Sequence, residues 1–194
     1  MTTSTKTLRI FRGPLAVLAL ALGLRAMAQQ VEYTWTPDGS QSGTAGGSGI
    51  WSGAGLNWWN GSAVIAAGNA TANQFGGASG NALLTFAGSG TITKQGAAVF
   101  RQGAAVQHTM AFLDGSNYTL LGAADGGAVI GNSHFIFNVA PTAVLAIGGD
   151  GNVFLVRAAT NQTDAPGLAF QGGGSVTLGA GALLRNDYSN SRMS

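Results

Sequence analysis

The fold is decided by two stretches, MAFLDGSNYTLLGAADGGAVI (residues 110–130) and FIFNVAPTAVLAIGGDGNVFL (residues 135–155), which align without a gap. The alignment pairs Phe112 with Phe137. Looser or more widely spaced copies of the same pattern contain Phe86 and Phe170. A recurrence of about 25 residues falls in the range that is the signature of repeat architectures, so it governs the assignment of every element around it.

Within each copy, apolar residues alternate with polar ones over three to five positions and then stop at Gly, Asn, Asp or Pro. This period of two is typical of short strands rather than helices. The repeat therefore predicts an all-β fold in which the coils of a β-solenoid stack about 4.8 Å apart, with the Phe residues forming an internal ladder. A β-sandwich or jelly roll is the alternative, but it does not explain the gapless match.

The spacing of the repeat has one long step, from Phe137 to Phe170. This step contains the polar segment Arg157–Pro166. We expect that segment to be a loop inserted in one coil, since polar segments with turn residues run over the surface.

Residues 1–28 predict a signal peptide. A basic stretch leads into the apolar run Pro14–Leu24, and small residues follow at Ala26 and Ala28. Eleven helical residues rise only about 16 Å, too little to cross a bilayer, so we expect cleavage after Ala28 rather than a transmembrane helix. The chain has no Cys, which suits an exported bacterial protein better than a small eukaryotic secreted domain.

Residues 29–81 differ in character from the repeats. They hold all four Trp residues and a Gly/Ser-rich stretch, and they lack the Phe pattern. Since the end of a solenoid exposes an unpaired strand edge, we expect residues 29–81 to form an N-terminal cap. We expect residues 82–194 to form the β-solenoid and to be truncated at its C-terminal end.

The opening of this segment resembles a known family. Tyr33-Thr-Trp35, Gly49-Ile-Trp51 and Leu56-Asn-Trp58-Trp59-Asn60 are similar to the N-terminal region of bacterial proteins with the autotransporter-associated β-strand repeat, and Leu168–Gly179 is similar to the repeat itself. The resemblance implies a right-handed parallel β-helix passenger at or released from the cell surface. Our leading hypothesis is that such a passenger has a structural or adhesive rather than an enzymatic role. Such passengers precede a C-terminal translocator barrel, which this sequence lacks; we therefore expect the N-terminal part of a longer chain or another export route.

The charge of the chain changes once the predicted signal is set aside. The whole chain carries nine basic and seven acidic residues, but four of the bases lie at or before Arg25. The remainder has five bases and seven acids, a net charge of −2, which argues against a nucleic-acid partner. The partners that we expect are a surface polysaccharide or a host or neighbouring cell, with no cofactor.

Two acidic residues are the strongest catalytic candidates. Asp125 and Asp150 occupy equal places in the alignment, so a solenoid would stack their carboxylates at one edge. Such a pair could act as acid and base in a polysaccharide lyase or glycosidase. Both precede Gly, however, and Asp-Gly is typical of turns, which is the interpretation that we favour.

The aromatic and histidine residues give further candidates. Exposed Trp faces could stack on sugar rings, whereas buried ones would close the end of the solenoid, and we favour the second interpretation. The residues concerned are Trp35, Trp51, Trp58 and Trp59. His108 and His134 lie about one repeat apart and could be neighbours in successive coils, but without a third ligand they predict no metal site.

Overall fold

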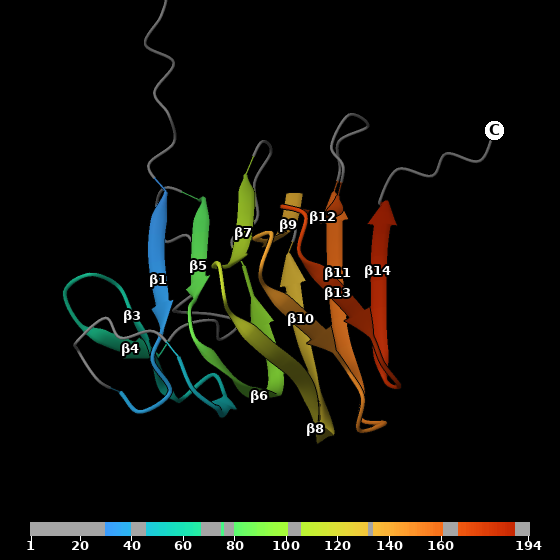
Figure 1. Cartoon of the computed structure of the whole chain (residues 1–194), viewed down its shortest axis with the longest axis horizontal. Coiled ribbons are helices and arrows are strands. Elements are labelled where there is room, and N and C mark those ends of the chain that lie inside the picture. The colour runs from blue at the N-terminus through green and yellow to red at the C-terminus, as the bar shows by residue number, and fades with distance from the viewer. Residues whose placement is uncertain are drawn as a thin grey trace, which may run out of the picture.

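The computed structural model describes residues 30–39, 46–66, 75, 80–100, 106–131, 134–160 and 167–188. All regular secondary structure in these ranges is β (Figure 1). No helix within them is long and apolar enough to span a bilayer. The predicted signal peptide and its cleavage point after Ala28 lie outside the described residues. The strands are β1 (Val31–Trp35), β2 (Gly49–Trp51), β3 (Leu56–Trp59), β4 (Val64–Ala66), β5 (Ala82–Phe86), β6 (Ser89–Val99), β7 (Gln107–Phe112), β8 (Asn117–Gly131), β9 (His134–Val139), β10 (Val144–Ile147), β11 (Phe154–Thr160), β12 (Leu168–Gln171), β13 (Ser175–Leu178) and β14 (Ala182–Tyr188).

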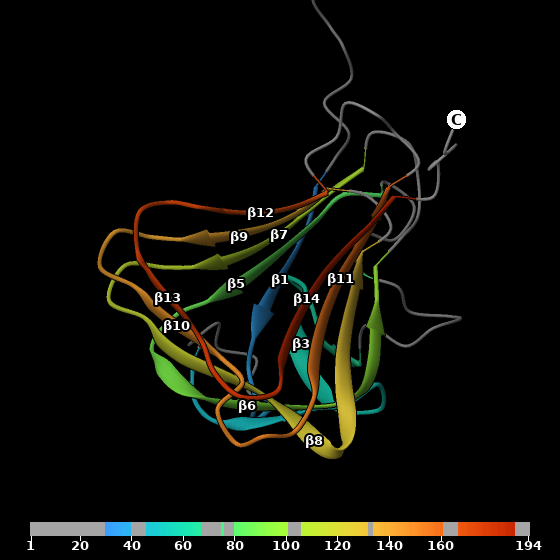
Figure 2. The ribbon, with the colours of Figure 1, turned by 90° about the vertical axis from the view of Figure 1, so that its right-hand side faces the viewer.

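The strands stack as a β-solenoid, as the repeat predicted. One sheet is the parallel row β1, β5, β7, β9 and β12, extended beyond β1 by the antiparallel strands β3 and β4. The other sheet holds β6 and β8, on which β10, β11, β13 and β14 continue in parallel. Figure 2 looks along the stack and shows the coils wrapping around one common interior.

The second sheet turns a corner within β8, which continues as one strand through the turn. The first half of β8 pairs with β10 and its second half pairs with β11, so β8 runs along two faces of the coil. Glycines allow the backbones of successive coils to approach at this corner. A Cβ on Gly122 would meet the carbonyl oxygen of Val153, and one on Gly127 would meet the carbonyl oxygen of Lys94. No larger residue fits either place without moving the backbone.

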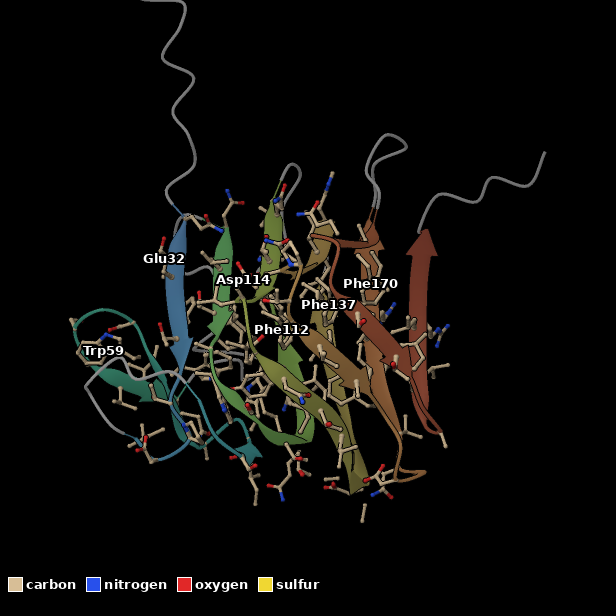
Figure 3. All side chains as sticks on the ribbon, in the orientation of Figure 1. Glu32, Trp59, Phe112, Asp114, Phe137 and Phe170 are labelled. Atoms are coloured by element: carbon tan, nitrogen blue, oxygen red, sulfur yellow. The ribbon has the colours of Figure 1, made fainter. Side chains whose placement is uncertain are left out.

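The interior carries the predicted ladder of phenylalanines. The ring of Phe112 stacks on Phe86 at 4.7 Å and on Phe137 at 6.5 Å, and Phe137 stacks on Phe170 at 5.0 Å. Phe86, Phe112 and Phe137 are buried, whereas Phe170, in the last of the described coils, is 39% exposed. Figure 3 labels the last three members of the ladder, which follow one another along the stack.

The register of the coils differs from the sequence alignment. In the sheet, Phe112 pairs with Val139 and Met110 pairs with Phe137. The same displacement holds in the next row, where Leu120 pairs with Ile147. The predicted pairing of Phe112 with Phe137 is therefore wrong by two positions. A slip of two positions keeps every side chain on its own face, so the apolar pattern could not distinguish the two registers.

The structure describes only the first four residues of the predicted loop Arg157–Pro166. Arg157 to Thr160 belong to β11, where they pair with Arg185 to Tyr188 of β14, so the loop prediction is wrong for this part. Residues 161–166 lie outside the described ranges. Strand pairing with the next coil extends β11 beyond the point at which the sequence turns polar.

The N-terminal segment packs directly on the repeats. β1 pairs in parallel with β5, and β2 pairs in parallel with β6, so the two sheets already begin within the predicted cap region of residues 29–81. The segment adds a large aromatic cluster to the interior. Its rings lie 4.8 to 6.5 Å from their neighbours: Trp35, Trp51, Trp58, Phe75, Phe86 and Phe100.

Candidate functional site

The two candidate carboxylates lie in a part of the coil that no strand pairing joins. The described pairs between their coils stop at Leu120 with Ile147 and resume at Gly127 with Phe154, and both differ by two positions from the sequence alignment. Between these pairs the backbones do not keep the register, because a Cβ on Gly122 would meet the carbonyl oxygen of Val153. Both aspartates are exposed. The stacking of Asp125 on Asp150 therefore stays a prediction.

Asp150 is engaged in its own turn. Its Oδ1 accepts the backbone N–H of Asn152 at 3.0 Å, and its Oδ2 accepts the side-chain amide of Asn152 at 2.9 Å. This is the local bonding by which Asp stabilises turns. The geometry of Asp150 thus favours the turn interpretation over a catalytic one.

Three of the four tryptophans are buried. Trp35, Trp51 and Trp58 have no exposed surface, and the indole N–H of Trp35 donates to the carbonyl oxygen of Gly47 at 3.1 Å. Trp59 is partly exposed on β3, which lies between β1 and β4 (Figure 3). A sugar ring could reach Trp59, but it could not stack on the other three without opening the interior.

The two histidines lie on opposite faces of their sheet. His108 points into the interior, where its ring lies 4.9 Å from that of Phe100. His134 pairs with Gln107, the neighbour of His108 in the chain, and so points outward. Among the described residues no three metal-ligating side chains gather in one place.

Lys94 is a buried residue that sequence reasoning missed. It has no exposed surface. Its Nζ donates to the carbonyl oxygens of Trp51 at 3.2 Å and Gln95 at 2.6 Å, and it lies 5.3 Å from the centre of the Trp51 ring. Alternation along β6 could have found it, since Lys94 is two positions after the buried Ile92 and therefore shares its inward face.

The surroundings of Lys94 explain how a charge is held there. The strand pairing between β6 and β8 shifts register between Lys94 and Gly96. On the other side of β6, Lys94 pairs with Trp51 of β2. Burial lowers the pKa of Lys94 from 10.5 to about 8, and the carboxylate of Asp125 partly opposes this shift. Lys94 thus links β6 to β2 through the carbonyl and the ring of Trp51, while the carbonyl of Gln95 on its own strand accepts a second hydrogen bond from the amine.

A stability change with pH follows from this burial. The folded pKa of Lys94 lies below the unfolded one, so between pH 8 and 10.5 the unfolded chain binds more protons and the free energy of unfolding rises with pH. Burial also raises the pKa of Tyr118 to about 12, which reverses the trend above pH 10. We expect a rise of about 2 kcal/mol between pH 8 and 10 in urea titrations.

Lys94→Met is the control for this pH effect. Methionine keeps the length of the side chain but does not titrate, so the rise should disappear in this variant. A wild-type chain whose stability is flat or falls from pH 8 to 10 would contradict the burial of a protonated Lys94.

Comparisons of the chain with protein-family models, with curated proteins and with solved structures give no significant match. The functional argument therefore rests on the geometry of this chain.

Proposed function

We propose that the chain is an exported β-helical passenger with a structural or adhesive role at a bacterial surface, and that it is not an enzyme. The observation that carries the proposal is the continuous interior. It runs from the Trp51 and Trp58 rings through the phenylalanine ladder to Phe170, and it is filled with side chains that pack on one another.

The exposed groups support the same proposal. Asp150 is bonded within its turn, and Asp114 accepts the Oγ1 hydroxyl of Thr142 in the next coil at 2.9 Å. The bonds of Asp150 stabilise a turn, and the bond between Thr142 and Asp114 stabilises the packing of one coil on the next. A stack that grows by adding equal coils suits display of a surface at a distance, since each coil depends only on its neighbours.

Export can be tested with a fragment that contains the predicted signal peptide. We expect residues 1–40 fused to alkaline phosphatase, which is active only outside the cytoplasm, to give phosphatase activity in a Gram-negative host. Sequencing of the mature N-terminus should begin at Gln29. Leu18→Arg with Leu20→Arg interrupts the apolar run and is the matched control. Activity that survives this double change, or an uncleaved product, would contradict the signal peptide.

The alternative of a carbohydrate-active β-helix is retained because Asp125 is exposed and Trp59 is partly exposed. We expect no cleavage of a panel of neutral and acidic polysaccharides by the folded chain. Cleavage that the double variant Asp125→Asn with Asp150→Asn abolishes, with unchanged folding, would overturn the structural proposal.

Sugar binding through the tryptophans is tested separately. Since three of the four indoles are buried, we expect tryptophan emission to stay unchanged on titration with oligosaccharides. A shift that Trp59→Phe removes would identify Trp59 as a sugar-binding residue.

A further inference from the structure

Two arginines lie side by side on the outer surface of the solenoid. Arg157 of β11 pairs with Arg185 of β14, and Figure 1 shows these two strands next to each other. The preceding residue of each strand belongs to the interior, since Val156 is buried and Leu184 packs against the core. Because side chains alternate along a strand, both arginines point outward, about one strand spacing of 4.8 Å apart.

This pair concentrates the positive charge of the described surface. The described ranges contain three basic residues, Lys94, Arg157 and Arg185, and Lys94 is buried. Arg157 is partly exposed and Arg185 is exposed. Asp187 follows two positions after Arg185 on β14, where its backbone pairs with Ala159. Like charges held this close repel each other, so an anion bound between the two arginines lowers the free energy of the pair.

An apolar row adjoins the arginines on the same face. Leu155 and Leu183 pair with each other two positions before the arginines, and they therefore also point outward. Leu155 is partly exposed, and Leu183 is 46% exposed. A ligand that covers both rows meets two cations and two aliphatic side chains. This combination suits a ligand with both an anionic group and an apolar face.

The surface lies on the side of the solenoid rather than at its end. Coils stack along the axis, so a further coil would lie beside β14 and would not cover the outward face of β11 and β14. The exposure of the two rows therefore does not depend on whether another coil follows.

We propose that this paired-arginine surface (Leu155, Arg157, Leu183 and Arg185) binds an acidic polysaccharide through the carboxylates of its sugars. A guanidinium binds a carboxylate through two parallel N–H···O bonds, and successive acidic sugars supply one carboxylate to each arginine. Each arginine already takes part in another interaction within the chain. A guanidinium has five N–H donors, so it can bind a carboxylate as well. The C–H faces of the sugar rings then lie on the two leucines.

The remaining charge favours a polysaccharide over a nucleic acid. Beyond Arg25 the chain has five bases and seven acids, and a nucleic-acid site needs an extended basic surface rather than two cations. The inference rests on the proposed function, since an adhesive passenger needs a ligand on the surface to which it adheres.

Binding of polygalacturonate to the full chain tests the proposal, with fully methyl-esterified polygalacturonate as the uncharged control. We expect the acidic polymer to bind in isothermal titration calorimetry and to raise the melting temperature, and the ester to do neither. Arg157→Gln with Arg185→Gln should weaken binding at least about tenfold, because two charge-assisted contacts are lost. The bases at or before Arg25 are the same in every variant, so they do not affect the comparison. Circular dichroism checks that the variants fold.

Arg157→Lys with Arg185→Lys is the matched variant, since lysine keeps both charges but cannot bind a carboxylate bidentately. We expect its affinity to lie between those of the wild type and the glutamine variant. A wild type that does not bind, equal binding of the acid and the ester, an unweakened glutamine variant, a lysine variant equal to the wild type, or a DNA duplex that binds as tightly would each overturn the proposal. The assay does not require export, so its failure would leave the phosphatase test of the proposed function unaffected.

Discussion

Replacing Phe137 with alanine lowers the free energy of unfolding by about 3 to 5 kcal/mol, the range for a fully buried Phe. Its ring is 0% exposed and lies between Phe112 and Phe170, with Phe135 at 5.3 Å. The substitution removes a whole member of the ladder and leaves a cavity that flanking coils, fixed by their strand pairing, cannot fill. Urea unfolding followed by circular dichroism measures the loss.

Phe170→Ala is the matched control for this prediction. Phe170 has the same register position one coil later, but it is 39% exposed, and within the described residues a coil lies on one side of it only. We expect it to cost about 1 to 2 kcal/mol, since less surface is removed from water on folding. Equal losses for the two variants, or a loss below about 1 kcal/mol for Phe137→Ala, would contradict an internal ladder.

Replacing Trp58 with alanine is expected to cost a similar amount, about 3 to 5 kcal/mol. The Trp58 ring packs edge-to-face on four others, at 5.1 Å from Trp51, 5.2 Å from Phe75, 5.3 Å from Trp35 and 5.7 Å from Phe86. Such pairs contribute beyond their buried area. The near-ultraviolet circular dichroism of the whole cluster should fall with the stability.

The next residue in the same strand is the control for the cluster. Trp59 is partly exposed on β3, so we expect Trp59→Ala to cost less than about 1.5 kcal/mol. If Trp59→Ala were the more damaging change, the two faces of β3 would be reversed. A small effect of both would mean that the N-terminal segment does not contribute to the interior.

The fold class could be predicted because the sequence carries two independent signals. Alternation at period two indicates strands, and the recurring Phe indicates coils of similar length. The register could not be predicted. The alignment and the structure both place Phe137 inside, and the choice between their registers depends on how much chain each corner consumes, which the apolar pattern does not record.

The candidate site was predicted less well for the same reason. The match of Asp125 with Asp150 depended on the register of the alignment, which the strand pairs on both sides of these residues do not follow. Lys94 was missed because a single charge in a strand is usually solvated. Only the packing of β2 on β6 shows that its amine is satisfied by two carbonyls.

A stack of coils in this register is tested most directly by paired cysteines. Thr119 pairs with Ala146 in the structure, whereas the alignment of the two repeats would pair Leu121 with Ala146. Adjacent parallel strands lie about 4.8 Å apart, within reach of a disulfide, while the diagonal pair is beyond about 7 Å. Mild oxidation of Thr119→Cys with Ala146→Cys should therefore give an intramolecular disulfide by mass spectrometry, and Leu121→Cys with Ala146→Cys should not. The reverse result would contradict the register, and no disulfide in either pair would contradict the stack itself.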